Sequence, residues 1–163
     1  GSFLDWKGLP LGQGQASRLH LGLVRGRQVA AGASAAGLGL IGGNSVGYAM
    51  ARGLPTVGTA ALEAALREEV ARLANEGPSE AEVDRAKVQY SREWLSELSQ
   101  FDARADELSA FATLHRDPER VNRRLFEIMR LGVDDVAAAA SAWLAADSAA
   151  SLCYHQEVTD AST

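Results

Sequence analysis

The hydrophobic pattern of the chain changes its period once, near residue 59. Before that residue, apolar and small side chains alternate along 46–51, which is the period of a β-strand. After it, apolar side chains recur every three or four positions, which is the period of an amphipathic helix. Strands followed by helices predict an α+β fold, with an antiparallel sheet and helices packed on one of its faces.

An uncharged segment, 28–51, spans the sequence just before this change of period. It is long enough to cross a membrane as a helix. However, it holds six glycines, and its middle reads Gly42-Gly43-Asn44, which is a turn signal. We therefore predict two strands, at about 29–40 and 45–52, and no membrane span.

The other elements are predicted from capping residues and apolar spacing. A short helix is expected over 17–27, with Ser17 as its N-cap, and a strand over 151–158. Five helices are expected between them, over 59–75, 79–100, 102–115, 117–129 and 134–144. The side chains expected to face the core are Leu19, Leu23, Val24, Leu62, Leu66, Val70, Leu73, Val83, Ala86, Tyr90, Trp94, Leu108, Phe111, Ala112, Val121, Leu125, Ile128, Met129, Val136, Ala140, Trp143 and Leu144.

Two helix boundaries carry specific signals. Gly77-Pro78 stops the helix that begins near residue 59, because glycine accepts a left-handed cap and proline cannot continue the helix. Ser79 and Glu82 form a capping box for the next helix. Glu69, in the first of these helices, is expected on its charged side, away from the core.

The stretch 115–122, H-R-D-P-E-R-V-N, matches the spacing of a protein-kinase catalytic loop. A kinase also needs a glycine-rich loop, a strand lysine and a D-F-G motif, and the sequence has no such set. Asp117-Pro118 is instead predicted to begin a helix, with Asp117 as the cap. Asn122 is then an exposed helical residue.

Residues 37–42 fit the dinucleotide-binding pattern G-x-G-x-x-G. That motif must leave a strand and open a helix, whose N-terminus binds the pyrophosphate. Here a strand pattern follows instead, and no acidic strand end lies about 20 residues further on. A small nucleotide-dependent enzyme stays a hypothesis that a titration with dinucleotides would test.

Histidine and cysteine residues give no metal signature. His20, His115 and His155 lack ligand spacing, and neither H-E-x-x-H nor H-x-x-E-H occurs. Cys153 is the single cysteine and is predicted to be a buried, inert thiol. One cysteine fits a reducing compartment, so we expect a cytoplasmic location. The net charge of −5 offers no basic surface for nucleic acid.

Three stretches carry a family resemblance in their order and spacing. They are 14–35, GQASRLHLGLVRGRQVAAGASA; 69–89, EVARLANEGPSEAEVDRAKVQ; and 117–144, DPERVNRRLFEIMRLGVDDVAAAASAWL. On these stretches the chain resembles the pitrilysin family of zinc metallopeptidases, to which mitochondrial processing peptidase and insulin-degrading enzyme belong. The resemblance extends from residue 14 to about 158.

The resemblance implies a pitrilysin-like α+β domain that pairs with a second half around a peptide-holding chamber. One half carries H-x-x-E-H, which binds zinc and supplies the glutamate that activates water. Since this chain lacks that motif, it resembles the zinc-free half. Zinc is then expected in the partner half, on the same polypeptide or on another subunit. The chain begins close to its S-R-L helix, so the resemblance also implies truncation at its start.

In catalytic pairs of the family, the zinc-free half offers the substrate an arginine and, seven residues later, a tyrosine. Arg25 matches the arginine, whereas Gly32 stands where the tyrosine is expected. Arg25 is thus a candidate substrate-binding residue for a peptide carbonyl or a C-terminal carboxylate. The alternative is a charge that complements the end of its helix or forms a salt bridge.

Two functions follow from the resemblance. In the first, the chain is the C-terminal, zinc-free domain of a pitrilysin-like peptidase and holds an extended peptide at the sheet edge near 29–40. In the second, which the missing tyrosine favours, it is a non-catalytic scaffold or partner subunit. Residues 3–158 are expected to form one domain, after a cloning remnant at 1–2 and before a frayed tail at 159–163. An unpaired sheet edge is also expected to favour self-association.

Overall fold

The structure is a computed structural model, and it describes residues 14–38, 46–144 and 149–154. These residues form a π-helix, two strands and then five α-helices. In chain order the elements are η2 (His20–Gly26), β1 (Ala30–Leu38), β2 (Val46–Gly53), α1 (Thr59–Glu76), α2 (Glu80–Ser99), α3 (Phe101–Leu114), α4 (Arg120–Met129) and α5 (Val133–Trp143).

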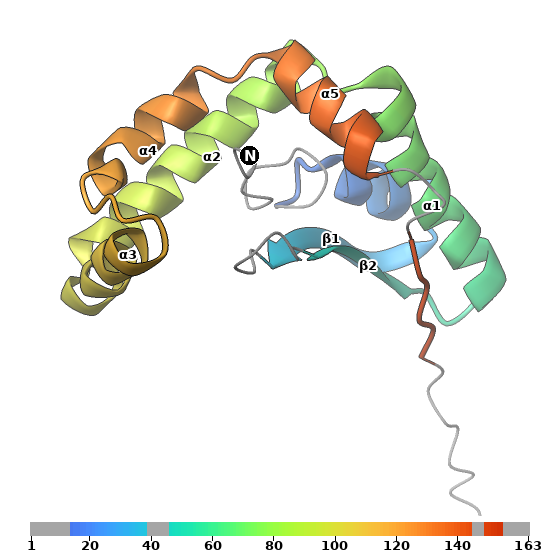
Figure 1. Cartoon of the computed structure of the whole chain (residues 1–163). Coiled ribbons are helices and arrows are strands. Elements are labelled where there is room, and N and C mark those ends of the chain that lie inside the picture. Colours follow the sequence, from blue (N-terminus) through green and yellow to red (C-terminus); the bar gives the residue numbers. More distant parts are fainter. Residues whose placement is uncertain (1–13, 39–45, 145–148, 155–163) are drawn as a thin grey trace, which may run out of the picture.

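The α-helices form an arch, and the two strands lie beneath it (Figure 1). One side of the arch is made by α1 and α5, which pack against each other, and the other side by α2, α3 and α4. η2 packs between the strands and α1, so one face of the strand pair is covered. The fold is therefore α+β, with helices on one face of an antiparallel sheet, as the change of period predicts.

β1 and β2 run antiparallel, and a β-bulge at Ala31 interrupts their register between Ala30 and Gly32. Beyond the bulge, side chains alternate between the two faces of the pair. The inner set packs against the core and is small throughout: Ala33, Ala35, Ala49 and Ala51. The outer set is Gly32, Ser34, Ala36, Val46, Tyr48, Met50 and Arg52.

The predicted short helix before the strands is present, but it is a π-helix. The Arg27 N–H donates to the Gly22 carbonyl oxygen, five residues back, at 2.9 Å. The Ser17 hydroxyl accepts the His20 N–H at 3.4 Å, in the capping role predicted for it. Leu19 and Leu23 are fully buried. Apolar spacing alone does not distinguish an α-turn from a π-turn, because both bring these two leucines to one side.

The junction of α1 and α2 follows its sequence signals. Gly77 ends α1 at a φ of 71°, in the region that favours glycine. In α2, the Glu82 N–H donates to the Ser79 hydroxyl at 3.4 Å, and the Ser79 N–H donates to the Glu82 carboxylate at 2.8 Å. The predicted capping box is thus complete, and local chemistry fixes where the chain turns from α1 into α2.

Two separate groups of buried side chains hold the fold together. The sheet-side cluster joins η2, β1, α1 and α5, and the limb cluster joins α2, α3 and α4. Members of the sheet-side cluster are Leu19, Leu23, Ala30, Ala65, Leu73 and Ala140. Members of the limb cluster are Tyr90, Trp94, Phe111 and Val121.

Several core predictions for the α-helices are wrong. Large parts of Leu108, Met129 and Trp143 are exposed, at 39%, 46% and 65%, and Ala112 is exposed too. Within the part of the chain that the structure describes, these side chains are at most partly covered. Apolar spacing marks a helix face, but it does not reveal whether another element covers that face.

The helix predicted to start at Asp117 begins three residues later. Its first turn is tight, since the Arg120 N–H donates to the Asp117 carbonyl at 3.2 Å, and α4 itself starts at Arg120. The Asp117 carboxylate pairs with Arg123 and makes no capping bond. Asn122 is exposed as predicted.

The prediction of a last strand over 151–158 is wrong for its described part. Residues 151–154 form no strand, and Leu152 and Tyr154 are 77% and 86% exposed. Their alternating pattern finds no neighbouring strand to pair with among the described residues. The remainder of that segment lies outside the described residues, as do the predicted remnant and tail. No helix of the described chain is long and apolar enough to cross a membrane.

Candidate functional site

Three backbone irregularities fall within thirteen residues, from η2 to the start of β1. η2 is a π-helix, Gln28 has a φ of 53°, and Ala31 lies in the β-bulge. Each type of irregularity interrupts regular hydrogen bonding or strains the backbone, and each is enriched at functional sites. The segment 20–32 is therefore where the fold departs most from regular geometry, and Arg25 lies in the middle of it.

Arg25 lies in the last turn of η2 and is exposed. No described residue forms a hydrogen bond or ion pair with its guanidinium. Arg27, two positions later, differs: its Nη1 donates to Glu68 Oε2 at 2.7 Å. A salt-bridge role for Arg25 thus has no partner among the described residues, whereas its charge still complements the C-terminal end of η2.

Gly32, where the family resemblance expects a tyrosine, lies on the outer face of β1. It stands directly opposite Arg52 of β2. A Cβ atom built at Gly32 would meet nothing within 4 Å. A side chain is therefore missing at this position although the backbone leaves room for one, and Arg25 has no aromatic companion from β1.

The outer face of the strand pair is apolar on β2 and nearly bare on β1. Val46, Tyr48 and Met50 are 52%, 43% and 53% exposed. The β1 residues opposite Tyr48 and Met50 are Ala36 and Ser34. β1 also contains no charged residue and no proline. It therefore lacks the residues with which edge strands ordinarily block pairing by another chain.

Glu69 of α1 is a residue that the sequence reading placed wrongly. It was expected on the charged side of the helix, but its side chain is 1% exposed. Its carboxylate lies against η2, where a Cβ atom at Gly22 would stand 2.5 Å from Oε1. Oε1 accepts from Arg72 Nη2 at 3.1 Å, and Oε2 has no hydrogen-bond partner among the described groups. The four-three-four spacing of Leu62, Leu66, Glu69 and Leu73 was the signal that could have placed it inward.

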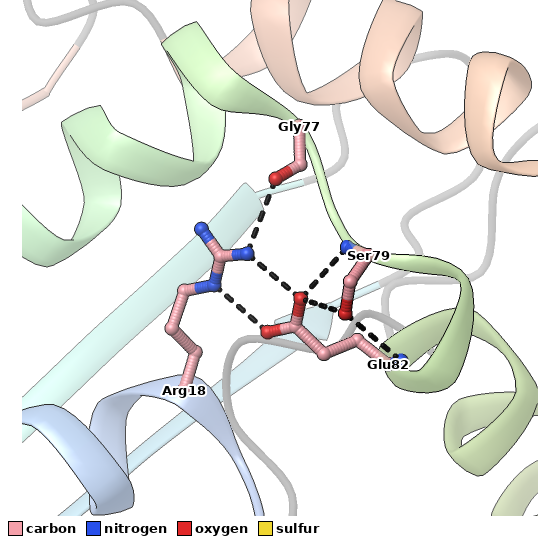
Figure 2. Close-up of polar contacts among 4 residues, drawn as sticks. All are labelled: Arg18, Gly77, Ser79 and Glu82. Carbon is pink, nitrogen blue, oxygen red and sulfur yellow. Dashed lines mark hydrogen bonds and ion pairs between the residues drawn. The ribbon is translucent and has the colours of Figure 1, made fainter.

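A polar clasp links Arg18, two residues before η2, to the junction of α1 and α2 (Figure 2). Arg18 Nε donates to Glu82 Oε1 at 2.9 Å, and its Nη2 donates to Glu82 Oε2 at 2.8 Å and to the Gly77 carbonyl at 3.1 Å. Ser79 completes the clasp through the capping box. The bidentate bond from Arg18 lowers the pKa of Glu82 to about 2. Arg18 is the S-R-L arginine of the resemblance, and its role here is to hold elements together.

The remaining candidates are not assembled into a chemical centre. Among the described residues, no group of three or more His, Cys, Asp or Glu side chains is placed to hold a metal ion. His20 lies in η2, His115 packs beside Phe111 at 5.4 Å between ring centroids, and His155 lies outside the described residues. The prediction of a buried Cys153 is wrong, since its thiol is exposed 4.0 Å from Glu63 Oε2.

The segment that matches G-x-G-x-x-G lies between two strands, which is not the setting of a dinucleotide site. Its first two residues end β1, and the others lie outside the described residues. The next described element is β2, so a strand follows where the motif requires a helix. This agrees with the strand pattern read from the sequence.

No protein-family model matches the sequence, and no curated protein matches it at a significant level. Solved structures do match. A protease from Helicobacter pylori aligns over 85% of this chain with a TM-score of 0.70 and 22% identity, and the chain spans about a third of that protein, 32%.

Two further structures come from Bordetella species, and this chain spans a larger share of each of them. A candidate zinc protease from Bordetella pertussis Tohama I aligns over 88% of this chain and 78% of its own, with a TM-score of 0.73 and 20% identity. The inactive peptidase domain of a candidate zinc protease from Bordetella parapertussis aligns over 88% and 77%, with a TM-score of 0.74 and 19% identity. The chain therefore has the fold of zinc-protease peptidase domains, which confirms the pitrilysin-like fold implied by the resemblance.

Proposed function

We propose that this chain is a zinc-free, non-catalytic domain of a zinc-protease assembly, in which it completes a peptide-binding chamber. The observation that carries the proposal is the likeness to the inactive peptidase domain from Bordetella parapertussis, over 88% of this chain. Zinc would be held by an H-x-x-E-H motif in the other half, on the same polypeptide or on a partner subunit. That half would supply the metal-bound water and its glutamate base.

β1 is the element that would hold the peptide. Its pairing with β2 uses one edge, and no other described strand occupies its second edge. An edge strand presents unpaired N–H and C=O groups, so an extended peptide can add to it as a further strand. Gly32, Ser34 and Ala36 on the outer face of β1 are small, so they place little steric obstacle in the way of an added strand.

Arg25 would act as a cation beside this edge. Its exposed guanidinium is unpaired among the described residues, and η2, which carries it, packs against β1. A guanidinium binds carbonyl and carboxylate oxygens through several N–H donors. Arg25 is thus suited to a peptide carbonyl or a C-terminal carboxylate. We place the assembly in the cytoplasm, as the single cysteine favours.

The first experiment is to sequence the gene upstream of the codon for Phe3, together with the neighbouring gene. An H-x-x-E-H motif in either frame would identify the zinc-bearing half. The two halves would then be produced together and assayed for bound zinc and for cleavage of fluorescein-labelled casein. We expect cleavage by the assembly and none by this chain alone. If the assembly binds zinc and cleaves casein equally well without this chain, the chamber role is wrong.

The role of Arg25 is tested in the same assembly with Arg25→Ala. Arg92→Ala is the matched control, because Arg92 is also exposed and lies on α2, one of the three helices of the limb cluster. We expect Arg25→Ala to lower casein cleavage while zinc content and assembly stay unchanged, and Arg92→Ala to change none of these. Unchanged cleavage by Arg25→Ala would remove Arg25 from the site.

A second candidate function is a non-catalytic scaffold or partner subunit with the same fold. Gly32 favours it, since the position that would support Arg25 offers no side chain. Gly32→Tyr separates the two functions, because a Cβ atom at this position meets nothing within 4 Å. In a chamber half, the added tyrosine is expected to change casein cleavage by the assembly. In a scaffold, it would leave cleavage unchanged.

The open edge of β1 also supports self-association through the same surface. Two copies could pair edge to edge, because neither charge nor proline blocks the strand. Light scattering at rising concentration would detect this pairing. A strictly monomeric mass would count against it.

A further inference from the structure

The outer face of β2 carries one cationic side chain followed by three apolar ones. Read from its C-terminal end, these side chains are Arg52, Met50, Tyr48 and Val46, at every second position. Arg52 is exposed, and no described residue forms a hydrogen bond or an ion pair with it. The row therefore presents an unneutralised positive charge beside an apolar strip about three residues long.

β1 leaves this row accessible from its own open edge. The residues of β1 that face Arg52, Met50 and Tyr48 are small: Gly32, Ser34 and Ala36. Gly32, opposite Arg52, has no side chain, and a Cβ atom there would touch nothing within 4 Å. Side chains from β2 can thus extend across β1 without obstruction, most freely at the position of Arg52.

A strand added at the second edge of β1 would lie two strand spacings from β2. Neighbouring strands are about 4.8 Å apart, so that separation is about 10 Å. An extended arginine and an extended glutamate, reaching from opposite sides over a bare glycine, together cover such a gap. Apolar side chains of the added strand would likewise meet Met50 and Tyr48 above the small residues of β1.

We propose that Arg52 is a specificity residue, which selects a peptide with an acidic side chain in register with Gly32 and apolar side chains at the next alternate positions. This inference rests on the proposed function, because it assumes that a peptide adds to β1. It names the class of peptide: an extended segment with one glutamate at an end of an apolar, alternating strand. Glutamate is preferred to aspartate because its longer side chain reaches further across β1.

Fluorescence anisotropy with four labelled octapeptides tests the proposal. Each peptide alternates threonine and valine, with glutamate or glutamine replacing the valine nearest one end. One pair carries the replacement near the N-terminus and the other near the C-terminus, because the peptide can add parallel or antiparallel to β1. We expect one glutamate peptide to bind about three-fold more tightly than its glutamine twin, as an exposed ion pair gives. The difference should shrink as salt is raised.

The preference is assigned to Arg52 with Arg52→Gln, and Arg92→Gln is the matched control. Arg52→Gln should bind both members of the preferred pair equally, at the affinity of the glutamine peptide, while Arg92→Gln keeps the three-fold preference. Equal binding of glutamate and glutamine peptides by the unsubstituted chain would overturn the role of Arg52 and leave strand addition standing. Absence of binding by all four peptides would instead overturn strand addition at β1, and the Arg52 proposal with it.

Discussion

The two buried clusters achieve compactness in opposite ways. The limb cluster is built from large rings: Trp94 stacks on Tyr90 at 6.1 Å and meets Phe111 edge-on at 6.5 Å, measured between ring centroids. The sheet-side cluster is built mostly from leucines, alanines and close backbone approaches, with the carboxylate of Glu69 buried against Gly22. Large side chains fill the limb cluster, whereas close approach of small residues fills the sheet-side cluster. The limb should therefore be damaged most by removing atoms, and the sheet side by adding them.

Trp94→Ala is expected to have the largest effect, because it removes the central ring of the limb cluster. Replacing a buried tryptophan by alanine costs about 3–5 kcal/mol of unfolding free energy. The loss should fall on α2, α3 and α4, and hydrogen exchange would show it there. If amides of η2 and β1 lose protection to the same extent, the two clusters unfold as one unit and the contrast between them fails.

Gly22→Ala is the matching test in the sheet-side cluster, where a single added methyl group should be enough to destabilise the fold. The new Cβ atom would stand 2.5 Å from Glu69 Oε1, so η2 or α1 must shift. Overpacking of this kind costs about 1–3 kcal/mol, which chemical denaturation would measure. Gly58→Ala is the control, since a Cβ atom there meets nothing within 4 Å. A second substitution, Glu69→Ala, should relieve most of the cost, and its failure to do so would mean that the contact is not the cause.

Acid should weaken the clasp that joins the sheet side to the start of α2. The pKa of Glu82 is about 2 in the folded chain, below its ordinary value of 4.5. The stabilisation is therefore complete above about pH 4.5 and is lost as pH falls from there through 2. Charge-assisted hydrogen bonds of this kind contribute about 1.5–3 kcal/mol.

The pH dependence is assigned to the clasp by comparing Arg18→Gln with the unsubstituted chain between pH 2 and 6. Without its arginine, Glu82 should titrate nearer its ordinary value, so the variant should lose less stability over this window. Arg92→Gln is the control, because Arg92 is exposed and no described residue forms an ion pair with it. Equal slopes for Arg18→Gln and the unsubstituted chain would exclude the clasp as the source.

The smallest effect is expected at the surface of the limb, where Asp117 pairs with Arg123. Asp117→Asn keeps a good capping residue but removes the charge, so it separates a cap from an ion pair. An exposed ion pair contributes about 0.2–1 kcal/mol and is screened by salt. Denaturation at low and high salt should show a loss only at low salt. No loss at either salt concentration would instead favour the capping role predicted from the sequence, because asparagine caps a helix as well as aspartate does.

Local chemistry made part of the fold predictable. The Ser79–Glu82 capping box and the Gly77 stop act within a few residues, so the sequence shows both partners of each interaction. The period of two along β2 was also readable, because it depends on backbone geometry alone. Arg25 was identified only through the family resemblance, and the structure places it on an irregular, exposed segment.

Features that depend on distant partners were not predictable. The apolar spacing of α1 points Glu69 inward, but its burial also depends on a glycine of η2 opposite it, and nothing within α1 signals that glycine. The π-turn of η2 and the exposed faces of Leu108 and Trp143 likewise depend on what packs nearby. Tertiary packing decides the burial and local geometry of these residues, and the sequence of one helix does not show which elements will pack against it.

The uniformity of β1 has a consequence for how the two strands find their alignment. Its residues are alanine, glycine and serine up to its last position, so sliding it by one step along β2 exchanges one small side chain for another. Packing therefore discriminates weakly between correct and shifted alignments. The alignment is fixed instead at the start of the strand, by the burial of Ala30 and by the bond from the Leu54 N–H to the Val29 carbonyl at 3.1 Å. The strand pair is thus expected to align from this end. If Ala30 is misplaced, the rest of β1 offers little to correct a shifted alignment.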